Sequence, residues 1–329
     1  MKAWQVHELG EPAQVLRLSD TAVPDPGPGQ LRVRVRASSA NFPDALLCRG
    51  QYQVRPDMPF TPGIELVGEV SALGEGAAGF AVGDRVIGSP ELPAGAFAEE
   101  SLMRADATLP APAALDDAEA SAFFVAYQTG WFALHRRAAL QAGETLLVHA
   151  AAGGVGSAAV QLGKAAGATV IAVVGGSDKA QAARQLGADL VIDRTTQDVV
   201  AVTKEATAGR GADVIFDPVG GDAYTWSTKC VAFEGRIVVV GFASGTIPNP
   251  PLGHALVKNY AILGLHWGLY QSRDPAAVRR AHDELCALAT AGIVGPLVSA
   301  RLGFDRVPDV VQQLADGSTI GRVSIEVAQ

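Results

Sequence analysis

The residues that could do chemistry are concentrated in a glycine-rich stretch that follows a short apolar run, Leu146–Val148. Gly154, Gly156 and Ala159 give the pattern G-x-G-x-x-A, and a helix is predicted from about residue 156 to residue 166. The first glycine permits a tight turn, the second lets backbone approach a diphosphate, and the alanine permits close helix–sheet packing. The amino end of the helix offers unpaired N–H groups to phosphate oxygens. An ordinary glycine-rich turn is the alternative, but the flanking strand and helix favour a dinucleotide site.

The end of the second apolar run, Thr169–Val174, bears on which dinucleotide binds. NAD sites place an Asp or Glu at this point, whereas this run is followed by two glycines and Ser177. Lys179 comes shortly afterwards, and Arg194 follows the third apolar run. Both cations could meet a 2′-phosphate, with the Ser177 hydroxyl as a further donor, although solvated surface charge is the alternative for each. The missing acid and the two cations together predict NADPH as the cofactor.

Metal and hydrolase chemistry find no support in the sequence. Zinc sites need three or four Cys, His, Asp or Glu ligands at suitable spacings, and here the histidines and cysteines are scattered, with no CxxC or HxxxH pair. A G-x-S-x-G segment, which would indicate a serine hydrolase, is also missing. Cys48 could be a reactive thiol, but a buried or bystander cysteine is the more ordinary interpretation. We therefore expect no metal.

Charge and composition exclude several classes of partner. The 329 residues carry 26 Lys and Arg against 34 Asp and Glu, which argues against nucleic acid or an anionic membrane as the main partner. Gly and Lys interrupt the apolar stretches, so no membrane-spanning helix is predicted. The first residues lack a basic segment followed by an apolar one, and three distant cysteines suit a reducing compartment. These features predict a cytoplasmic protein.

The elements that must position the glycine-rich stretch alternate between helices and strands. In chain order after the second apolar run, the predicted elements are a helix at 178–186, a strand at 190–192, a helix at 199–206, a strand at 214–216, a helix at 223–230 and a strand at 236–240. This alternation indicates a parallel sheet with crossover helices. By contrast, Leu31–Ala37 alternates apolar and basic residues, as a half-buried antiparallel strand does, and short β-elements continue to about residue 120. The sequence predicts an α/β protein that begins with a mostly-β domain.

Several segments match a known pattern. They are Asn41–Asp44, Gly50–Tyr52, Pro59–Glu65, Gly83–Val86 and Ala150–Gly156. With them the chain resembles the medium-chain dehydrogenase/reductase superfamily, and within it the zinc-independent, NADPH-dependent quinone oxidoreductases of the ζ-crystallin branch. The resemblance implies a GroES-like, mostly-β catalytic domain from residues 1–122 and 265–329. It also implies a Rossmann dinucleotide-binding domain with a doubly wound parallel sheet from residues 123–264. Zinc-containing relatives carry Gly-His-Glu where this chain has Ile64 in the middle, and a four-cysteine lobe that this chain lacks.

The same resemblance assigns residues to the site. It places Tyr52, Asn41 and Asp44 in the catalytic cleft, and for Asn41 and Asp44 the alternative is loop capping by their side chains. The cofactor-binding residues that it implies, together with those already named, are Asn41, Thr129, Gly153, Gly154, Val155, Gly156, Gly176, Ser177, Lys179, Arg194, Gly241, Phe242, His266, Trp267, Gly268 and Arg322. Arg194 stands where many relatives have a tyrosine, and Arg322 resembles a basic residue that closes over the cofactor.

Three functions fit these features. The first is reduction of a quinone by hydride from NADPH, with the protein supplying position rather than acid–base groups. The second is reduction of an enoyl thioester or another α,β-unsaturated carbonyl, for which Tyr52 would be the proton donor. The third, from another class, is an NADPH-binding protein with a structural or regulatory role. The resemblance also implies a homodimer formed through the edge strand of the nucleotide-domain sheet.

Overall fold

The computed structural model describes residues 1–327 and divides the chain into two compact units. Unit 1 consists of Met1–Val125, Pro275–Thr290 and the chain from Gly295 onward, and unit 2 consists of Ala126–Asp274 and Ala291–Val294. The domain limits expected from the sequence remain a prediction, and each unit is described by itself. Of the helices in residues 1–327, none is long and apolar enough to cross a membrane.

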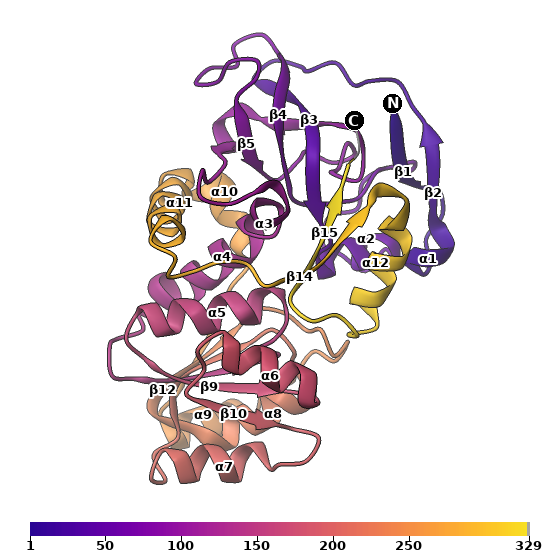
Figure 1. Cartoon of the computed structure of the whole chain (residues 1–329). Helices are drawn as coiled ribbons and strands as arrows, with labels where there is room; N and C mark the ends of the chain where they lie inside the picture. The colour runs from indigo at the N-terminus through magenta and orange to yellow at the C-terminus, as the bar shows by residue number, and fades with distance from the viewer. Residues whose placement is uncertain (328–329) are drawn as a thin grey trace. The chain divides into compact units, whose positions relative to one another are not determined.

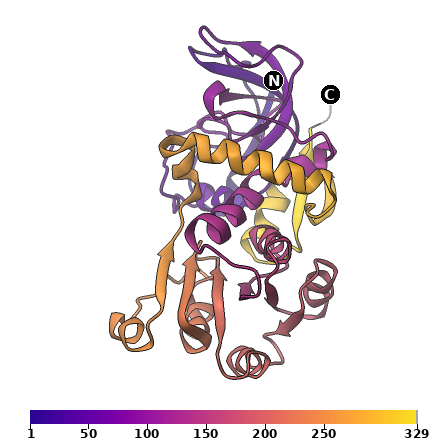
Figure 2. The same ribbon diagram turned by 90° about the vertical axis from the view of Figure 1, so that its left-hand side faces the viewer.

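Unit 2 is built on a six-stranded sheet in which all neighbouring strands are parallel, as predicted. Its strands are β8 (Thr145–His149), β9 (Thr169–Val174), β10 (Leu190–Asp193), β11 (Ala212–Asp217), β12 (Val231–Val239) and β13 (Ala261–Gly264). Their order across the sheet is β10-β9-β8-β11-β12-β13, and Figure 2 shows the red and orange arrows of β11, β12 and β13 pointing the same way. The order reverses between β8 and β11, which is the topological switch point where ligands of such sheets bind.

Helices cover both faces of this sheet. They are α4 (Phe124–Trp131), α5 (Gly154–Ala165), α6 (Ser177–Gln185), α7 (Val199–Ala206), α8 (Gly221–Cys230), α9 (Leu252–Lys258) and α10 (Tyr270–Arg273), with a π-helical turn at Phe132–Arg137 and a 3₁₀ turn at Trp267–Leu269. Helices α5 and α6 lie on one face and α7 on the other (Figure 1). A buried cluster that includes Leu147, Ile215 and Tyr224 fills the α7–α8 face. Doubly wound α/β architecture is thus confirmed.

Unit 1 contains a seven-stranded, mostly antiparallel sheet. The elements of unit 1 are, in chain order, β1 (Lys2–Val6), α1 (Pro12–Val15), β2 (Leu16–Asp20), β3 (Gln30–Ser39), α2 (Phe42–Cys48), β4 (Leu66–Leu73), β5 (Arg85–Gly88), β6 (Glu100–Arg104), β7 (Leu109–Pro110), α3 (Asp117–Ser121), α11 (Pro275–Thr290), β14 (Val298–Gly303), α12 (Val307–Ala315) and β15 (Arg322–Glu326), with 3₁₀ turns at Ala105–Ala107 and Phe304–Arg306. The strand order is β14-β15-β3-β4-β5-β7, with β6 also pairing β3 and a separate β1–β2 hairpin. The late strand β15 therefore pairs directly with β3.

Alternating apolar residues explain the position of β3. Leu31, Val33 and Val35 are fully buried in one core cluster, while the arginines between them form ion pairs or face solvent. A second cluster of unit 1 packs α2 and α12 together through residues such as Leu47 and Val311. The predicted half-buried strand is confirmed, and its packing brings the C-terminal segments of the chain onto the N-terminal sheet.

The limits of two predicted elements shift in the structure. Helix α5 begins at Gly154 rather than at about Gly156, because Gly153 already adopts the extended conformation of an N-cap residue. Strand β12 begins at Val231, directly after α8, five residues earlier than the apolar run at 236–240 indicates. Backbone pairing with β11, rather than apolar content, decides where β12 begins.

Candidate active site

The turn before α5 has the form expected of a phosphate site. Ala150 adopts a positive φ of 48°, and a Cβ atom at Gly156 would overlap the Ala150 carbonyl oxygen. Glycine at this position is therefore required by the turn itself as well as by any ligand. Within residues 1–327, no side chain caps the amino end of α5. The N–H groups and the positive end of the helix dipole are thus available to an anion.

Close packing of α5 depends on glycines that the motif does not contain. A Cβ atom at Gly163 would lie 2.5 Å from Leu146 Cδ2 on the sheet, and one at Gly130 would lie 2.8 Å from Leu162 Cδ1 on α5 itself. Gly130 belongs to α4, next to the buried Thr129. Thr129 therefore lies on a helix that packs against α5. Contact between Thr129 and a cofactor stays a prediction.

Two cations meet beyond the end of β9. The Arg194 guanidinium lies over Gly175, since a Cβ atom there would be 3.1 Å from Arg194 Nη2. Burial, and next the charge of Arg194, lower the pKa of Lys179, which places two positive charges in one neighbourhood. Gly176, at φ 94°, is the N-cap of α6, and Ser177 is its first residue. Like charges gathered at a helix amino end are an arrangement suited to a phosphate group.

Asp193, which the sequence analysis does not assign to the site, holds this turn. Asp193 Oδ1 accepts hydrogen bonds from the Gly176 N–H (2.9 Å), the Thr195 N–H (3.0 Å) and the Thr195 hydroxyl (2.7 Å). The bond from Gly176, followed by those from Thr195, lowers the pKa of Asp193. Its position directly after the predicted strand at 190–192 was the available signal.

The remaining cofactor residues predicted for unit 2 follow two neighbouring strands. Gly241 and Phe242 follow β12 after one intervening residue, Val240, and His266, Trp267 and Gly268 follow β13 after Leu265. These are carboxyl ends of parallel strands, where doubly wound sheets bind ligands. Trp267 is buried and His266 is exposed. The structure thus brings the predicted loops to the expected edge of the sheet.

In unit 1, Asn41 and Asp44 belong to one loop-and-helix arrangement. Asn41 is the N-cap of α2, and Asp44 Oδ2 accepts the Asn41 N–H at 2.7 Å. Asp44 Oδ1 accepts the Gly63 N–H at 3.0 Å, which ties α2 to the segment that contains Ile64. Burial raises the pKa of Asp44 to about 7, against the lowering effect of these backbone bonds. The carboxyl group is therefore poised to titrate near neutrality.

Glu65 and Arg322, 257 residues apart in the numbering, form a buried ion pair. Arg322 Nη1 donates to Asn41 Oδ1 at 2.6 Å, and Glu65 Oε1 accepts from Asn41 Nδ2 at 2.9 Å. Glu65 Oε2 accepts the Val125 N–H at 2.8 Å. Burial lowers the pKa of Arg322 to about 10, which leaves it charged at neutral pH. Contact between Arg322 and a cofactor stays a prediction, and its observed partners belong to unit 1.

Tyr52 lies half-buried against the α2–α12 core cluster. Burial, and next the charge of Asp44, raise the pKa of Tyr52, so the phenol keeps its proton at neutral pH. Cys48 is fully buried, and burial raises the pKa of its thiol to about 12, which favours the inert interpretation.

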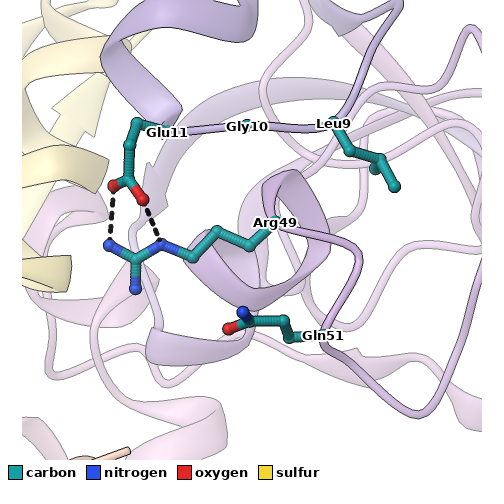
Figure 3. Close-up of a pocket in the computed structure, with 5 residues that line it drawn as sticks. All are labelled: Leu9, Gly10, Glu11, Arg49 and Gln51. Atoms are coloured by element: carbon teal, nitrogen blue, oxygen red, sulfur yellow. Dashed lines mark hydrogen bonds and ion pairs between the residues drawn. The ribbon is translucent and has the colours of Figure 1, made fainter.

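Unit 1 has a hollow of about 380 Å³ that none of the predicted site residues lines. Its lining consists of Leu9, Gly10, Glu11, Arg49 and Gln51 (Figure 3). Arg49 donates two hydrogen bonds to Glu11, at 3.0 and 2.7 Å. The charge that could attract an anion is thereby already neutralised within the protein.

Residues 1–327 contain no group of three or more His, Cys, Asp or Glu placed to hold a metal ion. Glu65, next to Ile64, is already occupied by Arg322, Asn41 and the Val125 N–H. The Glu65 carboxylate is therefore already held by groups of the protein, and zinc independence stays a prediction.

Comparison with known proteins supports the architecture of both units. Residues 27–113 match the family model of the alcohol dehydrogenase GroES-like domain, and residues 154–283 match that of the zinc-binding dehydrogenase. A quinone oxidoreductase-like protein 2 homolog of Nematostella vectensis is 38% identical over 331 residues, covering 100% of this chain and 89% of the relative. The structure of Escherichia coli quinone oxidoreductase complexed with NADPH is 30% identical, with a TM-score of 0.92, covering 99% of this chain and 100% of that one.

A relative of another kind is also similar. The mycocerosic acid synthase-like polyketide synthase of Mycobacterium tuberculosis is 32% identical over 308 residues, which are 92% of this chain and 14% of that protein. The full-length likeness to the quinone oxidoreductase-like relative and the GroES-like and nucleotide-domain matches agree with the two folds observed. The chain belongs to the medium-chain dehydrogenase/reductase superfamily, in its quinone oxidoreductase branch.

Proposed function

We propose that the protein is a zinc-independent, NADPH-dependent oxidoreductase that reduces a quinone. The observation that supports NADPH as the cofactor is that Lys179 and Arg194 lie close together just beyond the end of β9. No acidic residue follows directly after that strand. The uncapped amino end of α5 supplies the diphosphate site in the same unit. Quinone as the substrate is supported by the quinone oxidoreductase relatives, which cover the whole chain.

In this proposal the residues of the chain hold and orient the cofactor and the acceptor. The α5 amino end binds the diphosphate, and Lys179 and Arg194 bind the 2′-phosphate. When bound, NADPH supplies the hydride. Tyr52 forms part of the wall around the acceptor, and its protonated phenol donates a hydrogen bond to a carbonyl oxygen. The oxyanion that develops on a reduced quinone then takes its proton from water.

Zinc independence rests on the side chains around residue 64. Ile64 offers no ligand atom, and the carboxylate of Glu65 is already paired with Arg322. Purified protein should contain far less than one zinc per chain, and a chelator should leave turnover unchanged. Stoichiometric, tightly bound zinc would contradict this part of the proposal.

An enoyl-thioester reductase is the second candidate, and a specific observation favours it. The chain is similar over 92% of its length to a segment of a synthase named for an acid product rather than for a quinone. Tyr52, whose pKa is raised by burial and by Asp44, holds the proton that such a reaction needs at the α-carbon.

A substrate panel with NADPH oxidation as readout separates these candidates. We expect turnover with quinones, and much slower turnover with enoyl thioesters. A preference for an enoyl thioester would replace the first proposal by the second. NADPH binding without consumption of any acceptor would instead favour a structural or regulatory role.

We further propose a cytoplasmic homodimer formed by unit 2. Strand β13 ends the six-stranded sheet, and its outer edge pairs with no further strand in the described chain. The preceding helix α9 exposes Leu252 (74%), Leu256 (77%) and Val257 (82%). A second copy related by a two-fold axis would pair the two β13 edges and cover both apolar helices.

A further inference from the structure

Two strands of the parallel sheet end in an aspartate. Asp193 is the last residue of β10, and Asp217 is the last residue of β11. Strand β11 borders the switch point with β8, whereas β10 is the far edge of the half that follows β9. The two carboxylates therefore serve different halves of the carboxyl edge of the sheet, where doubly wound folds bind dinucleotides.

Asp217 is almost completely buried, with 1% of its surface exposed. Its Oδ1 accepts the Val219 N–H and the Gly220 N–H, each at 2.9 Å. Its Oδ2 is shielded from solvent and has no hydrogen-bond partner within residues 1–327. His149, the last residue of β8, lies near it, and burial lowers the pKa of His149 to about 4, so that the imidazole is neutral at pH 7. Because Oδ1 is shielded from water, the low dielectric of these surroundings strengthens the two backbone bonds that it accepts.

Those two bonds hold a turn that pairs with the loop after β12. The Ala243 N–H donates to Pro218 O and the Ser244 N–H donates to Val219 O, each at 3.0 Å. In return the Gly221 N–H donates to Thr246 O at 3.2 Å. The turn of residues 218–221 and the loop of residues 241–246 are thus one backbone-paired assembly.

The contact between turn and loop is close enough to require glycine. Gly220 and Gly221 have φ values of 69° and 53°, and a Cβ atom at Gly220 would lie 2.9 Å from Phe242 Cδ1. The position of Phe242, one of the cofactor-binding residues that the resemblance implies, is therefore set by the turn that Asp217 holds.

Asp193 holds a different turn of unit 2, the one between β9 and α6. Its Oδ1 accepts the Gly176 N–H at 2.9 Å and both donors of Thr195, and thereby fixes the turn between β9 and α6. That turn leads into α6, which carries Ser177 and Lys179, and its Gly175 lies under Arg194. Each aspartate thus orders one loop group.

We propose that Asp193 and Asp217 are separate positioning residues, the first for the 2′-phosphate-adenosine half of the cofactor site and the second for its nicotinamide half. This inference rests on the proposed NADPH function. It assigns a role to two carboxylates that touch backbone rather than ligand. It also predicts that the two halves of the site can be damaged independently.

The experiment compares the dissociation constants of NADPH and of 2′,5′-ADP, which contains only the adenosine half. Asp217→Ala should weaken NADPH about tenfold or more while leaving 2′,5′-ADP within about twofold, because two buried bonds are lost on the nicotinamide side only. Asp217→Asn keeps an acceptor oxygen and should recover most of the NADPH affinity. Asp193→Ala should weaken both ligands by a similar factor.

A matched control lies at the opposite end of β11. Asp213 Oδ2 accepts the Thr145 N–H at 2.8 Å, so Asp213→Ala removes the same kind of bond at the amino edge of the sheet. It should change neither dissociation constant. Equal weakening of both ligands by Asp217→Ala, or weakening by Asp213→Ala to the same extent, would overturn the assignment and leave Asp217 merely structural.

Hydrogen exchange on the unmutated protein tests the inference even where a variant fails to fold. NADPH should protect the amides of Val219, Gly220 and residues 241–246, and 2′,5′-ADP should protect Gly176 but not these. Protection of the 218–221 turn by 2′,5′-ADP would overturn the division into halves. Failure of the unmutated protein to bind NADPH would overturn the proposed function, whereas NADPH binding without these differences would overturn the inference alone.

Discussion

Asn41 uses every hydrogen-bonding group of its side chain inside unit 1. Its two amide hydrogens go to Ser39 O (3.0 Å) and Glu65 Oε1 (2.9 Å), and its oxygen accepts from Arg322. With 3% of its surface exposed, the amide has no free donor for a ligand within the described residues. This favours a structural role of Asn41 over direct catalysis, because its side chain connects Glu65 with Arg322.

Lys179 is the residue on which cofactor preference should depend. We expect Lys179→Ala to weaken NADPH by about 1.5–3 kcal/mol, the scale of a hydrogen bond to a charged group, and to leave NADH nearly unchanged. Titration of both cofactors measures this, with Lys204→Ala, an exposed lysine of α7, as the control. Tighter binding of NADH than of NADPH by the unmutated protein would contradict the assignment.

Tyr52→Phe separates the two enzymatic candidates, because it keeps the ring packed on the core and removes only the hydroxyl. With a quinone we expect less than about a tenfold loss in kcat/KM, or roughly 1.4 kcal/mol. With an enoyl thioester, loss of a positioned proton donor should cost on the order of 10²–10⁴-fold. A quinone rate that falls by about a thousandfold, roughly 4 kcal/mol, would show that the hydroxyl is not passive.

His149 makes stability depend on pH. Burial first, and the charge of Arg194 as well, lower its pKa from 6.5 to about 4, against the raising effect of Asp217. The unfolded chain then binds more protons than the folded one between these two values, so the free energy of unfolding decreases as pH falls from about 6.5 toward 4. The contribution of this one residue is on the order of 3 kcal/mol.

Denaturant unfolding at pH 7 and pH 4.5 measures this contribution. His149→Gln should reduce the difference in unfolding free energy between the two pH values, whereas His7→Gln, at an exposed position, should leave it as it is. An unchanged difference in His149→Gln would mean that other groups account for the acid lability.

At the scale of elements, α5 illustrates how glycines set the distance between a helix and its surroundings. Gly156 faces the Ala150 carbonyl in the preceding turn, and Gly163 faces Leu146 of the sheet. The first contact is with backbone, which cannot move aside without reshaping the turn. The second is with the end of a flexible side chain, which can adjust.

These two glycines should respond differently to alanine. Gly156→Ala should lower the thermal midpoint and weaken NADPH by about tenfold or more, because the N–H groups of the turn move. Gly163→Ala should lower the midpoint through the packing of α5 while keeping NADPH affinity within about threefold. Differential scanning fluorimetry and titration together report both quantities. Equal effects of the two substitutions on affinity would argue against a phosphate site at this turn.

At the scale of the whole molecule, the α9 surface determines the predicted oligomeric state. Leu256→Glu combined with Val257→Glu should convert a dimer to a monomer, since charges would be buried at the two-fold contact. Sedimentation velocity measures this. Val82→Glu, which changes an apolar residue of unit 1 that is 65% exposed, serves as the control and should leave the dimer intact. A monomeric unmutated protein would rule out the proposed dimer.

The sequence by itself determined the parts that depend on local pattern. The glycines around residue 154, the apolar runs and the change at about residue 120 predict a phosphate turn, a parallel sheet and a preceding β-rich part. These features can be predicted because backbone sterics and side-chain periodicity act over a few residues. The helix of residues 199–206 is confirmed for the same reason.

Only the tertiary structure decided which distant side chains share one environment. Arg322 meets Asn41 across 281 residues because β15 pairs with β3, and Asp217 comes close to His149 because β11 lies beside β8. Burial in these places then sets the pKa of Asp44 and of His149. Such juxtapositions follow from strand order and close packing, which no local spacing in the chain specifies.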